Sequence, residues 1–184
     1  MSSILILGAS YGSLLATKLL MAGHRVTLVC TAPTAALINR EGTVVRFPVK
    51  GREGLVSIAS RELPGTLHAA TPDDVQPAGF DLAVLGMQES QYGEEGVRQL
   101  MQRIARARIP CLAIMNMPPL VYLRRIAALD PDALKDCYTD PEVWQGFDPA
   151  LVSLASPTRR PSAPPASRRT CCRWACPPTS RPPA

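Results

Sequence analysis

The sequence predicts an α/β protein built on a doubly wound parallel sheet, and two observations lead to this prediction. Short apolar runs of strand length alternate with helix-length amphipathic segments along residues 1–140, a pattern typical of successive βαβ units. The run at 82–85, Leu-Ala-Val-Leu, is continuously apolar, as in parallel strands that are buried on both faces. Both features favour a sheet whose helices lie on its two faces.

The first βαβ unit spans residues 4–30. An apolar run at Ile4–Leu7 predicts a strand, and Val26–Val29 predicts a second strand parallel to it. Between them, leucines recur at helical spacing from Leu14 to Leu20, and Gly23 follows where a helix commonly ends. The connection is long enough for a right-handed crossover between parallel strands.

A glycine turn joins the first strand to this helix. It reads G-A-S-Y-G over Gly8, Ala9, Ser10, Tyr11 and Gly12. The dinucleotide fingerprint is G-x-G-x-x-G, so this turn is one residue shorter and has Ser10 in place of the middle glycine. We expect Gly8 to make the tight turn, Gly12 to let helix and strand approach, and the helix N-terminus to face a phosphate. The unit therefore predicts a Rossmann-type nucleotide-binding domain, and a βαβ unit that binds no nucleotide is the alternative.

The same letters also fit G-x-S-x-G, the nucleophile elbow of α/β-hydrolases, with Ser10 as the nucleophile. No earlier strand exists to supply an oxyanion amide, and the base must be His24 or His68. His24 follows the far end of the helix, about 16 Å from Ser10 at the usual rise per residue. His68 would then be the sole candidate for the catalytic base, so the hydrolase is the less favoured interpretation.

The rest of the chain predicts strands at 43–47, 55–59, 67–70, 80–85, 111–115 and 136–138, and helices ending at Arg40, over 93–108 and from Pro118 to about Leu129. The segment 141–156 connects this domain to the tail and has no assignment. Ligands of parallel sheets bind beyond the carboxyl ends of the strands. We therefore expect one crevice at that edge, lined by residues 8–12, 30–31, 86–91 and Asn116.

The amino-acid composition restricts the classes of protein to which the chain can belong. The chain has 184 residues, is 46% hydrophobic and contains no apolar run of the length of a membrane span. Its N-terminus enters a strand without a signal-peptide pattern, so we expect a cytoplasmic protein. The net charge is +5, but residues 157–184 hold six arginines and no acid, which leaves the remainder near neutral. The charge therefore gives no case for a nucleic-acid partner.

The six cysteines predict no metal site. Cys30, Cys111 and Cys137 lie in or beside expected strands, where a small apolar residue is common. Cys171, Cys172 and Cys176 stand in the tail at a spacing that matches no zinc pattern.

The tail, residues 157–184, has a composition that cannot build a core. It holds eight prolines, six arginines and no acid, which predicts disorder. It also lacks lysine, and its Arg, Pro, Ala, Ser and Cys residues are what GC-rich DNA encodes when it is read out of frame. One choice of codons from Thr158 onward, shifted by one nucleotide, encodes an acid-containing loop. We therefore expect a frameshift product; a natural disordered tail that binds nucleic acid is the alternative.

Residues 1–140 resemble the N-terminal half of ketopantoate reductases, which use NADPH. The resemblance rests on I-L-G-A-S-Y-G-S-L-L-A, A-G-H-R-V-T-L-V, F-D-L-A-V-L-G-M-Q-E-S-Q and I-M-N-M. Gln91 and Asn116 match the family's glutamine and asparagine, whereas Gln88 replaces a lysine and Met117 a glycine. An arginine expected near Thr31 for the 2′-phosphate is missing, so the chain looks like a divergent member.

The resemblance implies an oxidoreductase that reduces a ketone or 2-oxo acid, a small-molecule substrate, with NAD(P)H. The expected cofactor residues are Gly8, Ala9, Ser10, Tyr11, Gly12, Thr31, Gln88, Gln91 and Asn116. The family's proton-donating lysine and its acidic partner belong to a helical C-terminal domain that this chain lacks, so no catalytic residue is assigned. The second strand ends without an acid for a ribose hydroxyl, which favours NADP, with Arg40 as a candidate for the phosphate. The alternative is a module that binds a nucleotide and catalyses nothing.

Overall fold

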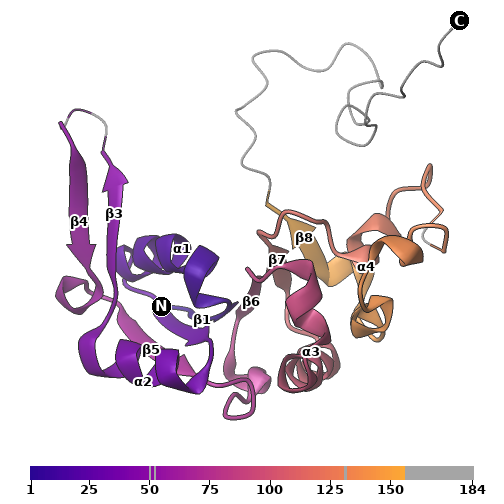
Figure 1. The fold of residues 1–184 in the computed structure, drawn as a ribbon, viewed down its shortest axis with the longest axis horizontal. Helices are drawn as coiled ribbons and strands as arrows, with labels where there is room; N and C mark the ends of the chain where they lie inside the picture. The colour runs from indigo at the N-terminus through magenta and orange to yellow at the C-terminus, as the bar shows by residue number, and fades with distance from the viewer. Residues whose placement is uncertain (50, 52, 131, 156–184) are drawn as a thin grey trace, which may run out of the picture.

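The computed structural model describes residues 1–49, 51, 53–130 and 132–155 (Figure 1). The predictions made for the tail, its disorder and its origin in a shifted frame, fall on 157–184 and lie outside the described residues. The same holds for Cys171, Cys172 and Cys176.

A parallel sheet of six strands forms the centre of the domain. Its order is β5-β2-β1-β6-β7-β8, and every neighbouring pair is parallel. The strands are β1 Ser3–Leu7, β2 Arg25–Val29, β5 Thr66–Ala70, β6 Leu82–Leu85, β7 Cys111–Ala113 and β8 Val152–Leu154. From β1 the chain moves outward through β2 to β5, and then returns to the other side of β1 at β6. This is the doubly wound Rossmann order, so the predicted fold class is confirmed.

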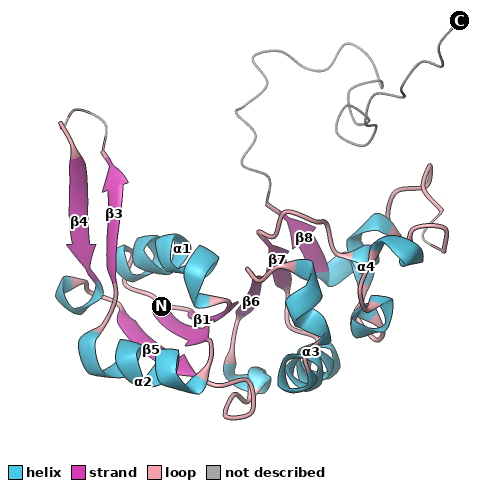
Figure 2. Cartoon of the chain, in the orientation of Figure 1, coloured by secondary structure: helices cyan, strands magenta, loops and turns pink. Residues whose placement is uncertain are grey.

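Three helices cover the two faces of the sheet: α1 Ala9–Met21, α2 Ala32–Glu41 and α3 Glu95–Ala107. Figure 2 shows α1 and α2 along the half of the sheet that holds β1 and β5, with α3 on the side of β7. Alternate residues of a strand face opposite sides, so Ile4 and Ile6 pack under α1 and α2. Leu5 and Leu7 pack in the core beneath α3. All four side chains are buried, as the continuous apolar run predicted.

The helix α1 begins earlier than the sequence suggested. The turn expected over residues 8–12 is reduced to Gly8, and Ala9 is already helical. Gly8 makes this abrupt change of direction with a φ of 101°, a value open mainly to glycine. Gly12 lies in the helix, where a Cβ atom would stand 2.5 Å from Ile6 Cγ2. Close packing of α1 on β1 therefore depends on this second glycine.

A hairpin stands apart from the parallel sheet. β3 Val44–Pro48 and β4 Leu55–Ala59 pair antiparallel with each other alone. Both strands were expected from the sequence, and Figure 1 shows them projecting from the domain beside α1.

The expectations for 118–138 were partly wrong. The helix α4 spans only Leu120–Leu123, after which tighter i→i+3 turns replace it: Arg125 N donates to Tyr122 O at 3.1 Å. Ile126 and Leu129 are exposed, so no buried apolar face sustains a longer helix. The strand expected over 136–138 is a 3-10 turn at Lys135–Cys137. Further 3-10 turns lie at Ser60–Glu62, Pro77–Gly79, Glu89–Gly93, Pro141–Trp144 and Pro149–Leu151.

The segment left without an assignment packs into the same core. Trp144 is 1% exposed, and its ring lies 5.4 Å from Tyr92 and 6.2 Å from Phe147, centroid to centroid. Beyond it, β8 joins the edge of the sheet, with Val152 opposite Cys111. The described residues thus continue the Rossmann sheet to Leu154.

Candidate functional site

The main cavity lies at the carboxyl ends of β1, β2 and β6. It has a volume of about 740 Å³ and is lined by Gly8, Ala9, Ser10, Tyr11, Val29, Cys30, Thr31, Thr34, Pro72, Gly86, Met87, Gln88, Gln91, Glu94 and Val97. β1 stands between β2 and β6, and the order of the strands reverses there. The cavity therefore occupies the topological switch point, where doubly wound sheets bind their ligands.

The N-terminus of α1 opens into this cavity. Its first helical hydrogen bond runs from Gly12 N to Gly8 O at 3.0 Å. The amides of Ala9, Ser10 and Tyr11 precede that bond and have no acceptor inside the helix, and no side chain caps them from the N-cap position. All three residues line the cavity. Together with the positive end of the helix dipole, these amides form a surface suited to an anion.

Two glycines let the cavity floor close tightly. Gly86 N donates to Leu7 O at 2.9 Å, which carries the main chain past the end of β1. A Cβ atom on Gly8 would lie 2.7 Å from Gly86 O, well inside contact distance. The first turn of α1 and the chain after β6 therefore meet backbone to backbone, and only a residue without a side chain fits at Gly8.

The chain after β6 is held by its own side chains. Gln88 N donates to Gln91 Oε1 at 3.0 Å, and Met87 N donates to the Tyr92 hydroxyl at 3.1 Å. Tyr92 is buried, and burial raises the pKa of its phenol well above the usual value. Gln91 thus has a structural role in addition to the cofactor contact expected from the sequence.

Hydroxyl groups mark the end of β2. Thr31 Oγ1 lies 3.0 Å from Thr34 Oγ1, and both residues line the cavity at the N-terminus of α2. Cys30 precedes them and is half-buried, and burial raises the pKa of its thiol. This part of the wall offers neutral groups that both donate and accept hydrogen bonds.

Asn116 lies in a neighbouring, smaller cavity. That cavity has a volume of about 180 Å³ and shares Tyr11, Met87 and Gln88 with the large one. The predicted crevice is thus present as two adjoining cavities. Gly12 lines neither of them, because it is buried against Ile6. The other cofactor residues expected from the sequence all line the large cavity.

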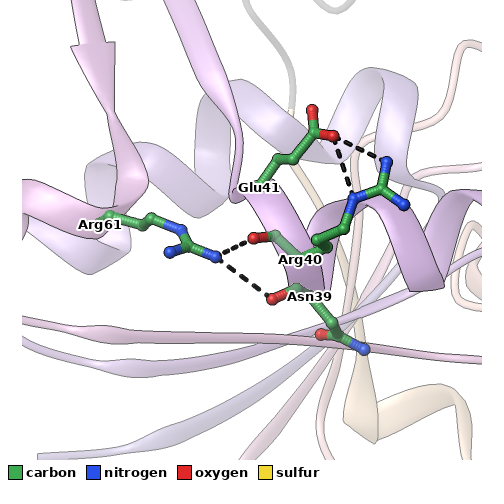
Figure 3. A network of polar contacts seen from close by, with 4 residues as sticks. All are labelled: Asn39, Arg40, Glu41 and Arg61. Atoms are coloured by element: carbon green, nitrogen blue, oxygen red, sulfur yellow. Dashed lines mark hydrogen bonds and ion pairs between the residues drawn. The ribbon is translucent and has the colours of Figure 1, made fainter.

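Charge in the large cavity differs from what the sequence suggested. Among the described residues that line it, Glu94 is the one acid, and neither lysine nor arginine appears. Arg40 sits in the last turn of α2, at the opposite end of the helix from Thr31. There it forms an ion pair with Glu41 at 2.7 Å (Figure 3). The expectation that Arg40 reaches the cavity was therefore wrong. Glu94 was not predicted as a site residue, because it lies at the start of α3, beyond the segment 86–91 that was expected to line the crevice.

The elbow interpretation of Ser10 finds no base. Ser10 is helical and lies in the first turn of α1. His24 Nδ1 accepts a hydrogen bond from Ser2 N at 3.2 Å, and His68 lines a separate cavity with Arg25 and Phe80. Neither histidine lines a cavity that contains Ser10.

The described part of the chain contains neither a metal-binding cluster nor a membrane-spanning helix. No group of three or more His, Cys, Asp or Glu side chains is placed to hold a metal ion there. Nor does any helix of that part combine the length and the hydropathy needed to cross a bilayer.

Comparisons with known proteins find similarity in structure alone. No family model matches the sequence, and no curated protein matches it either. Of the solved structures, 23 chains match. A protein described as a 2-dehydropantoate 2-reductase from Bacillus subtilis is 20% identical, with a TM-score of 0.43 over 70% of this chain and 38% of that chain.

Two further structures are similarly distant. A protein described as a ketopantoate reductase from Ralstonia solanacearum is 18% identical over 66% of this chain and 34% of its own, with a TM-score of 0.44. A ternary complex of GDP-mannose dehydrogenase from Pseudomonas aeruginosa is 17% identical over 82% and 34%, with a TM-score of 0.47. The chain thus spans between 34% and 38% of these three proteins. The fold assignment rests on the strand order of this chain itself.

Proposed function

We propose that this chain is the dinucleotide-binding domain of an oxidoreductase similar to ketopantoate reductase, which acts on a ketone or 2-oxo acid with NAD(P)H. The observation that carries the proposal is the large cavity at the switch point beside β1, into which the amides of Ala9, Ser10 and Tyr11 open. A volume of about 740 Å³ is within the range of small-molecule sites, about 300–1,000 Å³.

The residues present fit a pyrophosphate group. The absence of a side chain at Gly8 leaves the backbone of Gly8 and Gly86 in contact, which keeps the amides of the first turn of α1 accessible. Ser10 is exposed, so the hydroxyl that replaces the middle glycine of the fingerprint adds a donor without closing the cavity. Ala9, Ser10 and Tyr11 would hold the pyrophosphate through their amides.

The positions of the two cavities support roles for the remaining residues. Thr31 and Thr34 would hold the adenosine ribose at the end of β2, while Gln88 and Gln91 would line the opposite wall. Asn116, in the smaller cavity, would orient the reacting end of the cofactor and the carbonyl of the substrate. The nicotinamide, when bound, supplies the hydride that the reduction needs.

A module without catalysis is the second candidate for this chain alone. Of the described residues lining either cavity, the titratable ones are Tyr11, Cys30, Glu89 and Glu94. None of these is the lysine that the resemblance implies as the proton donor. We therefore expect the chain to bind the cofactor, and the reduction to require groups outside the described residues.

Titration with NADH and NADPH, followed by the fluorescence of the reduced nicotinamide, tests this function. We expect saturable binding of at least one of them and no oxidation when ketones or 2-oxo acids are added. Ketone-dependent oxidation would instead favour a complete enzyme. No binding at millimolar concentration would refute the proposal and leave a Rossmann domain without a cofactor.

A pair of variants on α1 locates the binding. Ser10→Glu places a carboxylate at the helix N-terminus, where it competes with the pyrophosphate and is itself tolerated by the helix dipole. The affinity for the nucleotide should fall about tenfold, which corresponds to about 1.4 kcal/mol. Met21→Glu adds the same charge at the exposed far end of α1 and should leave the affinity unchanged.

Labelling of Cys30 provides an independent test. The thiol lines the cavity and has a raised pKa because of burial, so its reaction with N-ethylmaleimide should be slow at neutral pH and accelerate as pH rises. Nucleotide at ten times its Kd should slow labelling about tenfold, because about one molecule in ten remains free. Peptide mass spectrometry separates Cys30 from Cys137, which is exposed and serves as the internal control. Equal slowing at both cysteines would contradict binding in the cavity.

A further inference from the structure

The proposed function leaves open which dinucleotide the cavity accepts, and the end of β2 decides this. Dinucleotide folds distinguish NAD from NADP by what surrounds the adenosine ribose there: an acid binds the 2′-hydroxyl, and an arginine accommodates the 2′-phosphate. In this chain β2 is followed by Cys30 and Thr31, and Thr34 lies in the first turn of α2. The hydroxyl groups of the two threonines are 3.0 Å apart.

Two arginines at the C-terminal end of α2, Arg40 in its last turn and Arg61 beside it, are engaged elsewhere. Arg40 pairs with Glu41, and the guanidinium of Arg61 donates to the carbonyl oxygens of Asn39 and Arg40 (Figure 3). These contacts are in the last turn of α2, about 12 Å along the helix from its first residue at the usual rise. Among the described residues, no lysine or arginine lines the cavity.

The cavity contains a negative charge instead. Glu94, at the N-cap of α3, lines it together with the two threonines. A phosphate monoester carries a charge of about −1.5 to −2 at neutral pH. Moving it from water toward a carboxylate, with no cation among the described residues that line the cavity, is unfavourable. Pro33 lacks an amide hydrogen, which reduces the donors that the N-terminus of α2 can offer an anion.

A free 2′-hydroxyl is not repelled by Glu94 and needs no cation as a partner. It is neutral, and the Thr31 and Thr34 hydroxyls can each donate to it or accept from it. A carboxylate such as that of Glu94 accepts hydrogen bonds from ribose hydroxyls, so the acid that is missing after β2 is supplied to the same cavity by the chain before α3.

On the basis of the proposed function, we infer that the cavity selects the dinucleotide with a free 2′-hydroxyl, NAD(H), against NADP(H), and that Thr31, Thr34 and Glu94 set this preference. The preference is opposite to that expected from the sequence, in which the lack of an acid after the second strand favoured NADP. The difference arises because the sequence shows which residues follow β2 but not which distant residues share its cavity.

Binding measurements on the full chain test the inference. NADH and NADPH are titrated separately by nicotinamide fluorescence, and NADH should bind about tenfold more tightly or better, a difference of about 1.4 kcal/mol. Equal affinities, or tighter NADPH binding, would overturn the inference while leaving the proposed function intact. Failure of both to bind would overturn the proposed function and the inference together.

Three variants identify the residues responsible. Thr31→Arg should raise the affinity for NADPH about tenfold and change that for NADH little, since the added cation meets the 2′-phosphate. Leu37→Arg is the matched control, because it adds the same charge at an exposed position of α2 outside the cavity, and it should leave both affinities unchanged. Glu94→Gln removes the negative charge from the cavity, so it should bring the affinities for NADH and NADPH closer together. An equal gain in NADPH affinity from both arginine variants would show a general charge effect and refute the role of Thr31.

Discussion

Replacing Gly8 by alanine should destabilise the domain by about 3 kcal/mol and abolish nucleotide binding. Part of the cost is the backbone, whose φ of 101° costs a residue with a side chain about 1–3 kcal/mol. The rest is a collision, since the new Cβ atom would lie 2.7 Å from Gly86 O and 3.1 Å from Met87 Cγ. Gly86 cannot retreat easily because its amide is bonded to Leu7 O at 2.9 Å. The overlap between the new Cβ atom and Gly86 O must therefore be removed by a shift of α1, which displaces the amides of its first turn from the cavity.

Gly23→Ala separates these two contributions. Gly23 also has a positive φ, 80°, but a Cβ atom there would meet nothing within 4 Å. This variant should cost only about 1 kcal/mol, the conformational penalty alone, and should retain nucleotide binding. Urea unfolding followed by circular dichroism measures both variants. Equal destabilisation by the two would contradict the close approach of Gly8 and Gly86.

The centre of the fold was predictable because its signals are local. Three short, largely apolar segments each form a largely buried strand of the parallel sheet: Ile4–Leu7, Val26–Val29 and 82–85. Helix α3 was equally clear, since its buried side chains Val97, Leu100 and Ile104 recur at helical spacing. In these segments the same residues determine both local conformation and burial.

The C-terminal part was harder because its structure depends on distant contacts. β8 has only three residues, Val152–Leu154, and exists through its pairing with β7. The helix expected from Pro118 to about Leu129 has apolar residues at suitable spacing, but the side chains of Ile126 and Leu129 are exposed. One local signal was available: Asp140 and Asp148 each precede a proline and cap a 3-10 turn through their side chains.

The candidate site could also be predicted only in part from the sequence. The glycine turn and the strand ends predicted where the cavity lies, because the carboxyl ends of parallel strands share an edge. The sequence could not show that Asn116 occupies a separate adjoining cavity, or that Glu94 joins Thr31 in the large one. Both depend on how the chains after β6 and β7 turn, which tertiary packing decides.

Truncating Trp144 to alanine should destabilise the domain by about 3–5 kcal/mol, the usual range for deleting a buried aromatic side chain. The indole is 1% exposed and packs against Tyr92 and Phe147, so it joins the segment after residue 140 to the chain that forms the cavity wall. A typical domain has about 5–15 kcal/mol of stability, so this loss would leave a large unfolded fraction. Urea unfolding should show a lower midpoint and, because Tyr92 holds Met87 N, weaker nucleotide binding by the molecules that remain folded.

Trp144→Phe is the matched variant. It keeps an aromatic ring against Tyr92 and Phe147 but loses volume, which alone would destabilise the core. It also removes the indole Nε1, a buried donor with no hydrogen-bond partner among the described residues, and leaving such a group unpaired costs about 1–3 kcal/mol. The two effects oppose each other, so we expect a net change of about 1 kcal/mol or less. If Trp144→Ala also changed the free energy of unfolding by less than about 1 kcal/mol, the segment 141–155 would not share a core with the Rossmann domain, and the domain would end near residue 140.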